Sequence, residues 1–181
     1  GFKDTVEARE MTIADIKRTV NDFKQAALNA FEAGFDGVEI HSANGYLLQQ
    51  FLHKNSNHRT DEYGGSIENR ARIIFEILDE LKTVVDLSRV GIRFNPALHG
   101  MMGIEVDDET TDLYNYVINR LNDYPLAYIH LTEPFTDVSK VDLAINYQPQ
   151  LYQQVAEGLP LVRVGSLISS PLNSVVVLKN S

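Results

Sequence analysis

The chain has 181 residues, with 25 acidic side chains against 16 basic ones and no cysteine. The formal net charge of −9 argues against nucleic acid as a partner, because neutralising phosphates requires a basic face. The lack of cysteine excludes disulfides and thiolate chemistry. Apolar runs are far shorter than the roughly 18 residues of a membrane span, and a signal-peptide pattern is absent. We therefore expect a soluble, cytoplasmic protein without membrane association.

Helical and extended patterns alternate along the chain. Thr12 is the expected N-cap of the first helix, with Asp15 three residues later, and its apolar spacing continues to Gly34. Further helices are predicted at 46–52, 67–85, 109–121 and 149–157, strands at 36–41, 89–95, 127–131 and 161–165, and a last apolar segment at 175–178. Strands that alternate with helices predict an α/β fold with a parallel sheet. No linker or repeat divides residues 1–181, so a single domain is expected.

The sequence HSANGY, residues 41–46, directly follows the first predicted strand. His41, Asn44 and Tyr46 should therefore cluster where this strand passes into a loop. A histidine and an asparagine can both donate hydrogen bonds to one carbonyl oxygen, and a tyrosine hydroxyl can deliver a proton to carbon. These three residues predict a site that reduces an activated C=C bond.

Together with NHRTDEYGGSIENR at 57–70, this block resembles the Old Yellow Enzyme family of FMN-dependent ene-reductases. The resemblance implies a (β/α)8 barrel of the TIM type. In that family NADPH or NADH reduces FMN, and the reduced flavin passes a hydride to the β-carbon of an α,β-unsaturated carbonyl compound. The resemblance assigns carbonyl binding to His41 and Asn44, and proton donation to Tyr46. It thus implies an FMN-dependent oxidoreductase.

The resemblance also assigns residues to the flavin. Arg93, in RVGIRFNP, matches the arginine beside the flavin pyrimidine edge, where a positive charge would stabilise the anionic reduced flavin. Neutralisation of Glu39 on the neighbouring strand is an equally weighted role for Arg93. Gly165 and Ser166, in VRVGSL, are the candidate phosphate-facing residues, although Ser166 departs from the glycine or asparagine common there.

Side-chain alternation favours a barrel over an open sheet. If His41 points inward, so do Glu39, Arg93, His130 and Arg163, whereas apolar residues alternate with them and face the helices. An open sheet covered on both faces would be apolar on both. The inner face is instead predicted to carry charges that need one another or a ligand.

The resemblance aligns the four predicted strands with the fourth to seventh of the barrel. A complete barrel of this type typically needs about 250 residues, so we expect an incomplete one of about four β/α units. Exposed edges on its first and last strands would favour a homo-oligomer or a complementing chain. Two alternatives stay open: a non-catalytic partial barrel unable to bind FMN by itself, and a barrel of other chemistry that binds a phosphorylated metabolite at Gly165.

Other polar residues are given structural roles. Charged and amide side chains in the loop after the short helix are expected to hold that loop through hydrogen bonds. They are Arg59, Asp61, Glu68, Asn69 and Arg70. No metal site is predicted, because His53 and His58 lack partner ligands at the usual spacing. The segment 96–108 is expected to form a mobile rim loop.

Overall fold

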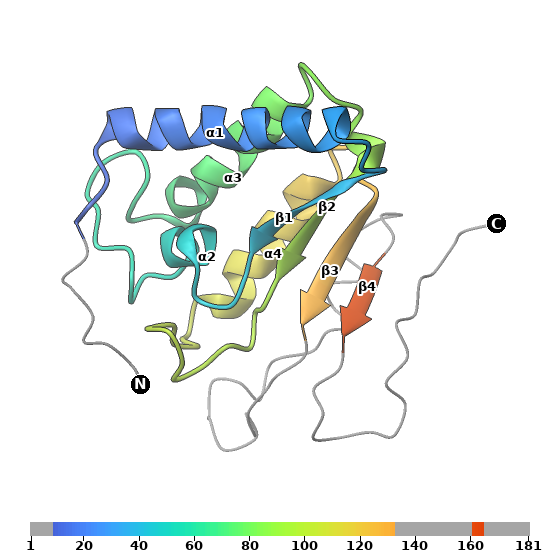
Figure 1. The fold of residues 1–181 in the computed structure, drawn as a ribbon. Coiled ribbons are helices and arrows are strands. Elements are labelled where there is room, and N and C mark those ends of the chain that lie inside the picture. The colour runs from blue at the N-terminus through green and yellow to red at the C-terminus, as the bar shows by residue number, and fades with distance from the viewer. Residues whose placement is uncertain (1–8, 133–160, 165–181) are drawn as a thin grey trace, which may run out of the picture.

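The computed structural model describes residues 9–132 and 161–164. The elements are α1 (Ile13–Glu32), β1 (Val38–Ser42), α2 (Leu47–Leu52), α3 (Ile67–Leu81), the 3-10 helix η1 (Leu87–Arg89), β2 (Val90–Phe94), α4 (Thr110–Leu121), β3 (Tyr128–Thr132) and β4 (Leu161–Val164). All strand pairs are parallel, and the sheet order is β1–β2–β3–β4 (Figure 1). The helix predicted at 149–157 and the segment at 175–178 lie outside the described residues.

Helix α1 begins where the sequence predicts. The Thr12 hydroxyl accepts a hydrogen bond from the Asp15 amide at 3.1 Å, and the Asp15 carboxylate accepts one from the Thr12 amide at 3.0 Å. This capping box satisfies two backbone donors that a helix start otherwise leaves free. Helix α3 begins in a similar way at Ser66, but it ends at Leu81 rather than at Val85. Turns follow α3, and η1 then leads into β2. The 3-10 helix η1 was not predicted from the sequence.

The predicted alternation of side chains is confirmed on β1, β2 and β3. Val38 at the start of β1 is half-buried, and the other apolar helix-facing residues of these strands are buried: Ile40, Val90, Ile92, Phe94, Ile129 and Leu131. Each such side chain contributes about 1.5–3 kcal/mol through removal from water. The register aligns residues in rows across β1, β2 and β3. One row is Glu39, Gly91 and Tyr128, and the other is His41, Arg93 and His130. Because paired residues share a face, the predicted inner row is confirmed for these strands.

On β4 the register differs from the prediction. Arg163 pairs with Leu131, and Val162 pairs with His130. Arg163 therefore takes the register position of the outward row. The predicted alignment of Arg163 with His130 is therefore wrong for the backbone register, which is shifted by one residue.

The helices cover one face of this sheet, as Figure 1 shows for α3 and α4 behind β1 and β2 and for α1 lying across α3. Parallel strands with helices on one face are what a segment of a (β/α) barrel requires. Among the described helices, none is long and apolar enough to cross a membrane.

The loop between α2 and α3 is held by the residues predicted to be structural. Arg70 is buried and donates to the carbonyl oxygens of Leu52 at 2.7 Å and Gly65 at 2.6 Å, and to the Glu109 carboxylate at 2.7 Å. Arg59 forms two hydrogen bonds with Asp61. These contacts join α2, the glycine turn and the start of α4, so they fix the frame on which the residues of the HSANGY block are placed.

Candidate active site

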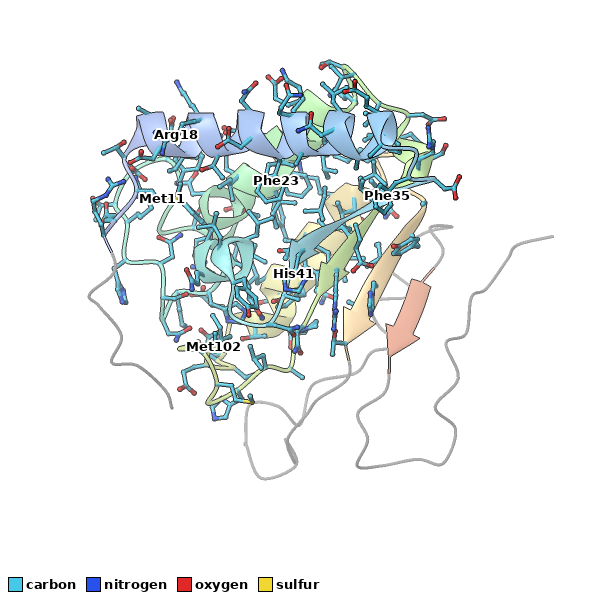
Figure 2. All side chains as sticks on the ribbon, viewed as in Figure 1. Met11, Arg18, Phe23, Phe35, His41 and Met102 are labelled. Carbon is cyan, nitrogen blue, oxygen red and sulfur yellow. The ribbon has the colours of Figure 1, made fainter. Side chains whose placement is uncertain are left out.

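The HSANGY residues lie at the carboxyl end of β1, as predicted. His41 is half-buried in the strand, and its ring lies 5.5 Å from that of Tyr46, centroid to centroid, in an edge-on arrangement. Tyr46 is the N-cap residue of α2 and is 57% exposed. In Figure 2, His41 is on the side toward which the strand arrows point, whereas Phe35 lies at the opposite end. The two rings thus lie together at the carboxyl end of β1.

Asn44 is placed by an unusual backbone conformation. Its φ is +57°, in the left-handed region that asparagine adopts more readily than most residues, and Gly45 follows with φ +77°. A Cβ atom at Gly45 would lie 2.1 Å from the Cβ of Met102, so the segment after β2 packs closely on this turn. The Asn95 side chain donates from Nδ2 to the Oδ1 of Asn44 at 2.9 Å.

Arg93 lies beside His41 in the register of the sheet. Its Nε donates to the Thr132 hydroxyl at 3.0 Å, and its terminal nitrogens make no hydrogen bond within the described residues. Burial and the positive charge of Arg93 lower the pKa of His41 below its usual range. His41 is therefore a neutral imidazole at pH 7, which suits a hydrogen-bond donor to a carbonyl oxygen.

Glu39 contacts His130, and not Arg93, which the sequence suggested as its partner. Its carboxylate lies 2.9 Å from the Nδ1 of His130, and it also hydrogen-bonds Tyr128. No ion pair joins Glu39 to Arg93 in the described part of the chain, and the hydrogen bond from His130 lowers the pKa of Glu39 more than the charge of Arg93 does. Arg93 thus acts on Glu39 through its charge and without a direct contact, and its terminal nitrogens make no hydrogen bond within the described residues.

A buried polar network below the HSANGY turn was not anticipated from the sequence. The Gln49 side chain accepts from the Gly45 amide at 2.8 Å and donates to the Asn95 carbonyl at 2.7 Å and to the Tyr114 hydroxyl at 3.2 Å. The Tyr114 hydroxyl lies 3.1 Å from the Nε2 of His53. The available signal was the spacing of Gln49 in α2 and His53, the residue that caps the end of α2, which are four residues apart and are both buried.

His53 is the far end of this network. It is 1% exposed, and burial lowers its pKa to about 4, so the ring is neutral at pH 7. Its Nδ1 lies 3.1 Å from the Glu105 carbonyl, which can only accept, so Nδ1 carries the hydrogen. Nε2 then accepts from the Tyr114 hydroxyl. This network links α2 to the segment 96–108.

The segment 96–108 lies along the rim next to the site. Met102 has φ +54° and is 60% exposed, and Met101 is 44% exposed. The segment is held to the α2–α3 loop where Asn55 donates to the Gly103 carbonyl. Its mobility stays a prediction, but the structure gives it an apolar, exposed tip near Gly45.

The hydrogen-bond donors at the carboxyl ends of β1 and β2 fit part of a flavin mononucleotide. A half-buried arginine with free terminal donors suits the acceptor-rich pyrimidine edge of the flavin. A neutral histidine and an asparagine amide, close to it, suit a carbonyl oxygen rather than a second anion. The phosphate-facing candidates, Gly165 and Ser166, lie outside the described residues. Their role stays a prediction.

Fold and site together define a segment of a (β/α)-barrel enzyme with a polar site at the carboxyl ends of the strands. Residues 2–181 match the family described as NADH:flavin oxidoreductase / NADH oxidase. The chain belongs to this family, whose description names a flavin and NADH as the redox partners. The resemblance to Old Yellow Enzyme is thereby confirmed at the level of the family.

Curated relatives include two plant enzymes. The 12-oxophytodienoate reductase 1 of Oryza sativa subsp. japonica is 46% identical over 127 residues, which cover 70% of this chain and 33% of that protein. The 12-oxophytodienoate reductase 2 of Arabidopsis thaliana is 45% identical over 126 residues, with the same shares of each chain. The chain thus spans about a third of the length of the curated relatives it matches.

Solved structures agree with this placement. Morphinone reductase superposes with a TM-score of 0.78 and 38% identity, covering 90% of this chain and 42% of that one. The Old Yellow Enzyme from Pichia sp. gives a TM-score of 0.76 and 35% identity, covering 89% and 40%. A further structure is of morphinone reductase in complex with tetrahydroNAD. The expected fold, an incomplete (β/α) barrel, is therefore confirmed.

Proposed function

We propose that this chain carries the substrate-binding part of an FMN-dependent ene-reductase that reduces the C=C bond of α,β-unsaturated carbonyl compounds with NADPH or NADH. The observation that supports this most directly is the grouping of His41, Asn44 and Tyr46 at the end of one strand, with Arg93 beside them on the next. The plant relatives named 12-oxophytodienoate reductases have a compatible activity.

His41 and Asn44 would hold the substrate's carbonyl oxygen. Both are neutral donors, so they polarise the carbonyl without delivering a full positive charge to it. As a hydride reaches the β-carbon, negative charge moves onto the oxygen, and the two hydrogen bonds strengthen. Stabilisation that is larger in the transition state than in the ground state lowers the barrier.

Tyr46 would complete the reaction as the proton donor. Its hydroxyl is on an exposed ring that contacts the His41 ring edge-on, and this closeness to His41 supports the role. A phenol is a weak acid, but the enolate that follows hydride addition is basic enough to take its proton at the α-carbon. The product is the saturated carbonyl compound.

Arg93 would face the flavin. When bound and reduced, FMN supplies the hydride that the substrate accepts. The fixed charge of Arg93 would favour the anionic form of the reduced cofactor, and its link to Thr132 would hold the guanidinium in place.

The experiment that tests this proposal is anaerobic. The purified protein would be loaded with FMN, reduced with NADPH, and mixed with a cyclic enone such as 2-cyclohexenone. Enone-dependent return of the oxidised flavin absorbance is the expected result. Failure of added FMN to show quenching or a spectral shift would instead favour a non-catalytic partial barrel. Bound flavin that the enone does not reoxidise would favour other chemistry on the same fold.

A further inference from the structure

Asn95 has a buried side chain without an assigned role, and only the nitrogen of its amide group has a hydrogen-bond partner within the described residues. It lies just after β2 and is fully buried. Within the described residues, its Nδ2 makes one side-chain hydrogen bond, to Asn44 Oδ1 at 2.9 Å, and its own Oδ1 has no partner. A buried amide that leaves its oxygen unsatisfied costs free energy, so its single bond calls for an explanation.

That single bond determines which end of the Asn44 amide faces outward. The amide of Asn44 has an acceptor oxygen and a donor NH2 group, which lie in one plane and point in different directions from Cγ. With Oδ1 engaged by Asn95, the NH2 group is turned away from Asn95 and is the end left to donate. A substrate carbonyl can only accept, so only this orientation of Asn44 is useful for binding it.

Gln49 holds both members of this pair through the backbone. Its Nε2 donates to the Asn95 carbonyl at 2.7 Å, while its Oε1 accepts from the amide of Gly45, the residue after Asn44, at 2.8 Å. The four residues form a closed ring of hydrogen bonds between the HSANGY turn and the end of β2. The ring fixes the distance between Asn44 and Asn95 in the absence of substrate.

We infer that Asn95 is a positioning residue, which orients the Asn44 amide so that its NH2 group faces the substrate's carbonyl oxygen. This inference rests on the proposed function. It goes beyond that function in assigning the orientation of one binding group to a residue that follows the neighbouring strand β2. Asn95 itself touches neither substrate nor flavin in this account, and it acts only through Asn44.

The decisive variant is Asn95→Asp. A carboxylate of nearly the same shape cannot donate to Asn44 Oδ1, and it would instead accept from Asn44 Nδ2, which turns the wrong end of the amide toward the substrate. The KM for 2-cyclohexenone should rise about 10- to 100-fold, the usual consequence of a lost hydrogen bond that leaves a polar group unpaired. Reoxidation of the reduced flavin by dioxygen, which needs no carbonyl donor, should keep the wild-type rate.

A double-mutant cycle separates positioning from general damage. In an Asn44→Ala background, Asn95→Asp should cause no further rise in the enone KM, because the residue through which it acts is gone. Asn57→Asp is the matched control, since Asn57 is another buried amide and donates to the carbonyls of Phe51 and Tyr63, both at 2.7 Å. It should lower the melting temperature without changing the enone KM.

The outcomes are distinct. An unchanged enone KM in Asn95→Asp would overturn the inference, because Asn44 would then not depend on a donor from Asn95. Equal losses with enone and dioxygen, or a KM effect that persists without Asn44, would also overturn it in favour of a structural role. If wild-type protein binds FMN but the enone does not reoxidise it, the proposed function fails and the inference fails with it. Asn95→Ala gives the same comparison, with a smaller rise expected, should the aspartate variant not fold.

Discussion

The carboxylate of Glu39 lies 2.9 Å from the Nδ1 of His130, although β2 separates the strands that carry them. The contact spans β2 at the level of Gly91, which has no side chain to intervene. Tyr128 occupies the space instead and hydrogen-bonds the same carboxylate. Glu39 on the inner face thus contacts His130, which lies in the same row as His41 and Arg93, and neither His41 nor Arg93 forms an ion pair with this carboxylate within the described residues.

Glu39→Gln should lower stability in a pH-dependent way. Burial raises the pKa of Glu39, but the hydrogen bond from His130 and nearby positive charge outweigh it, so the pKa lies below its usual 4.5. A carboxyl with a lowered pKa stabilises the folded state above its unfolded pKa, and this is lost as the pH falls through the folded value. The variant should melt below wild type at pH 7, and the difference should shrink below pH 4.5. Glu32→Gln, on the exposed end of α1, is the control; an equal effect there would contradict the assignment.

Gly91→Ala should destabilise the sheet through a clash with one ring. A Cβ at this position would lie 2.3 Å from the Cζ of Tyr128, which real structures do not tolerate, so the ring or the strand must move. Overpacking of this kind typically costs about 1–3 kcal/mol. Urea denaturation of the purified protein would measure the loss. In a Tyr128→Ala background the same glycine substitution should cost much less, and an undiminished cost would show that Tyr128 is not the obstacle.

Tyr46→Phe should separate the two half-reactions. Removal of the hydroxyl leaves the ring in its contact with His41 but takes away the proton donor, so the oxidative half-reaction with enone should slow by about 10²–10⁴. Reduction of the flavin by NADPH should stay near the wild-type rate. Stopped-flow absorbance would follow both steps. Enone reoxidation at the wild-type rate would rule out Tyr46 as the donor.

His53 should make stability fall on mild acidification. Its pKa is about 4 in the folded protein against 6.5 for a free imidazole, so the unfolded state binds the proton first. Protonation of His53 therefore leaves the free energy of unfolding unchanged above pH 6.5 and lowers it as the pH falls from 6.5 to 4. At about 1.4 kcal/mol for each pH unit, the total loss is about 3 kcal/mol. Thermal melting between pH 4 and 8 would show this slope.

His53→Gln should flatten that dependence, at the cost of a lower melting temperature at pH 8, where the hydrogen bonds to Tyr114 and Glu105 are also lost. His58→Gln, which removes an exposed imidazole, should keep the wild-type profile. A wild-type slope in the His53 variant would show that another group is responsible.

The sequence by itself determined the elements, the family and the main candidates of the site. Thr12 with Asp15 predicts the start of α1, the alternation in VEIHS and VGIRF predicts which side chains face inward, and HSANGY predicts a carbonyl-binding group. The first two succeed because capping and strand alternation depend on residues that are close in the chain, and the role of HSANGY stays a prediction.

Only the tertiary structure decided which residues serve one another. Glu39 pairs with His130 across the sheet, Arg163 is aligned with Leu131, and Asn95 after β2 is linked to Asn44 after β1. These relationships depend on strand register, which is set by packing across the whole sheet. The motif HSANGY predicts that Asn44 donates to a carbonyl oxygen. The hydrogen bond that we infer sets the direction of this donation comes from the side chain of Asn95, 51 residues away.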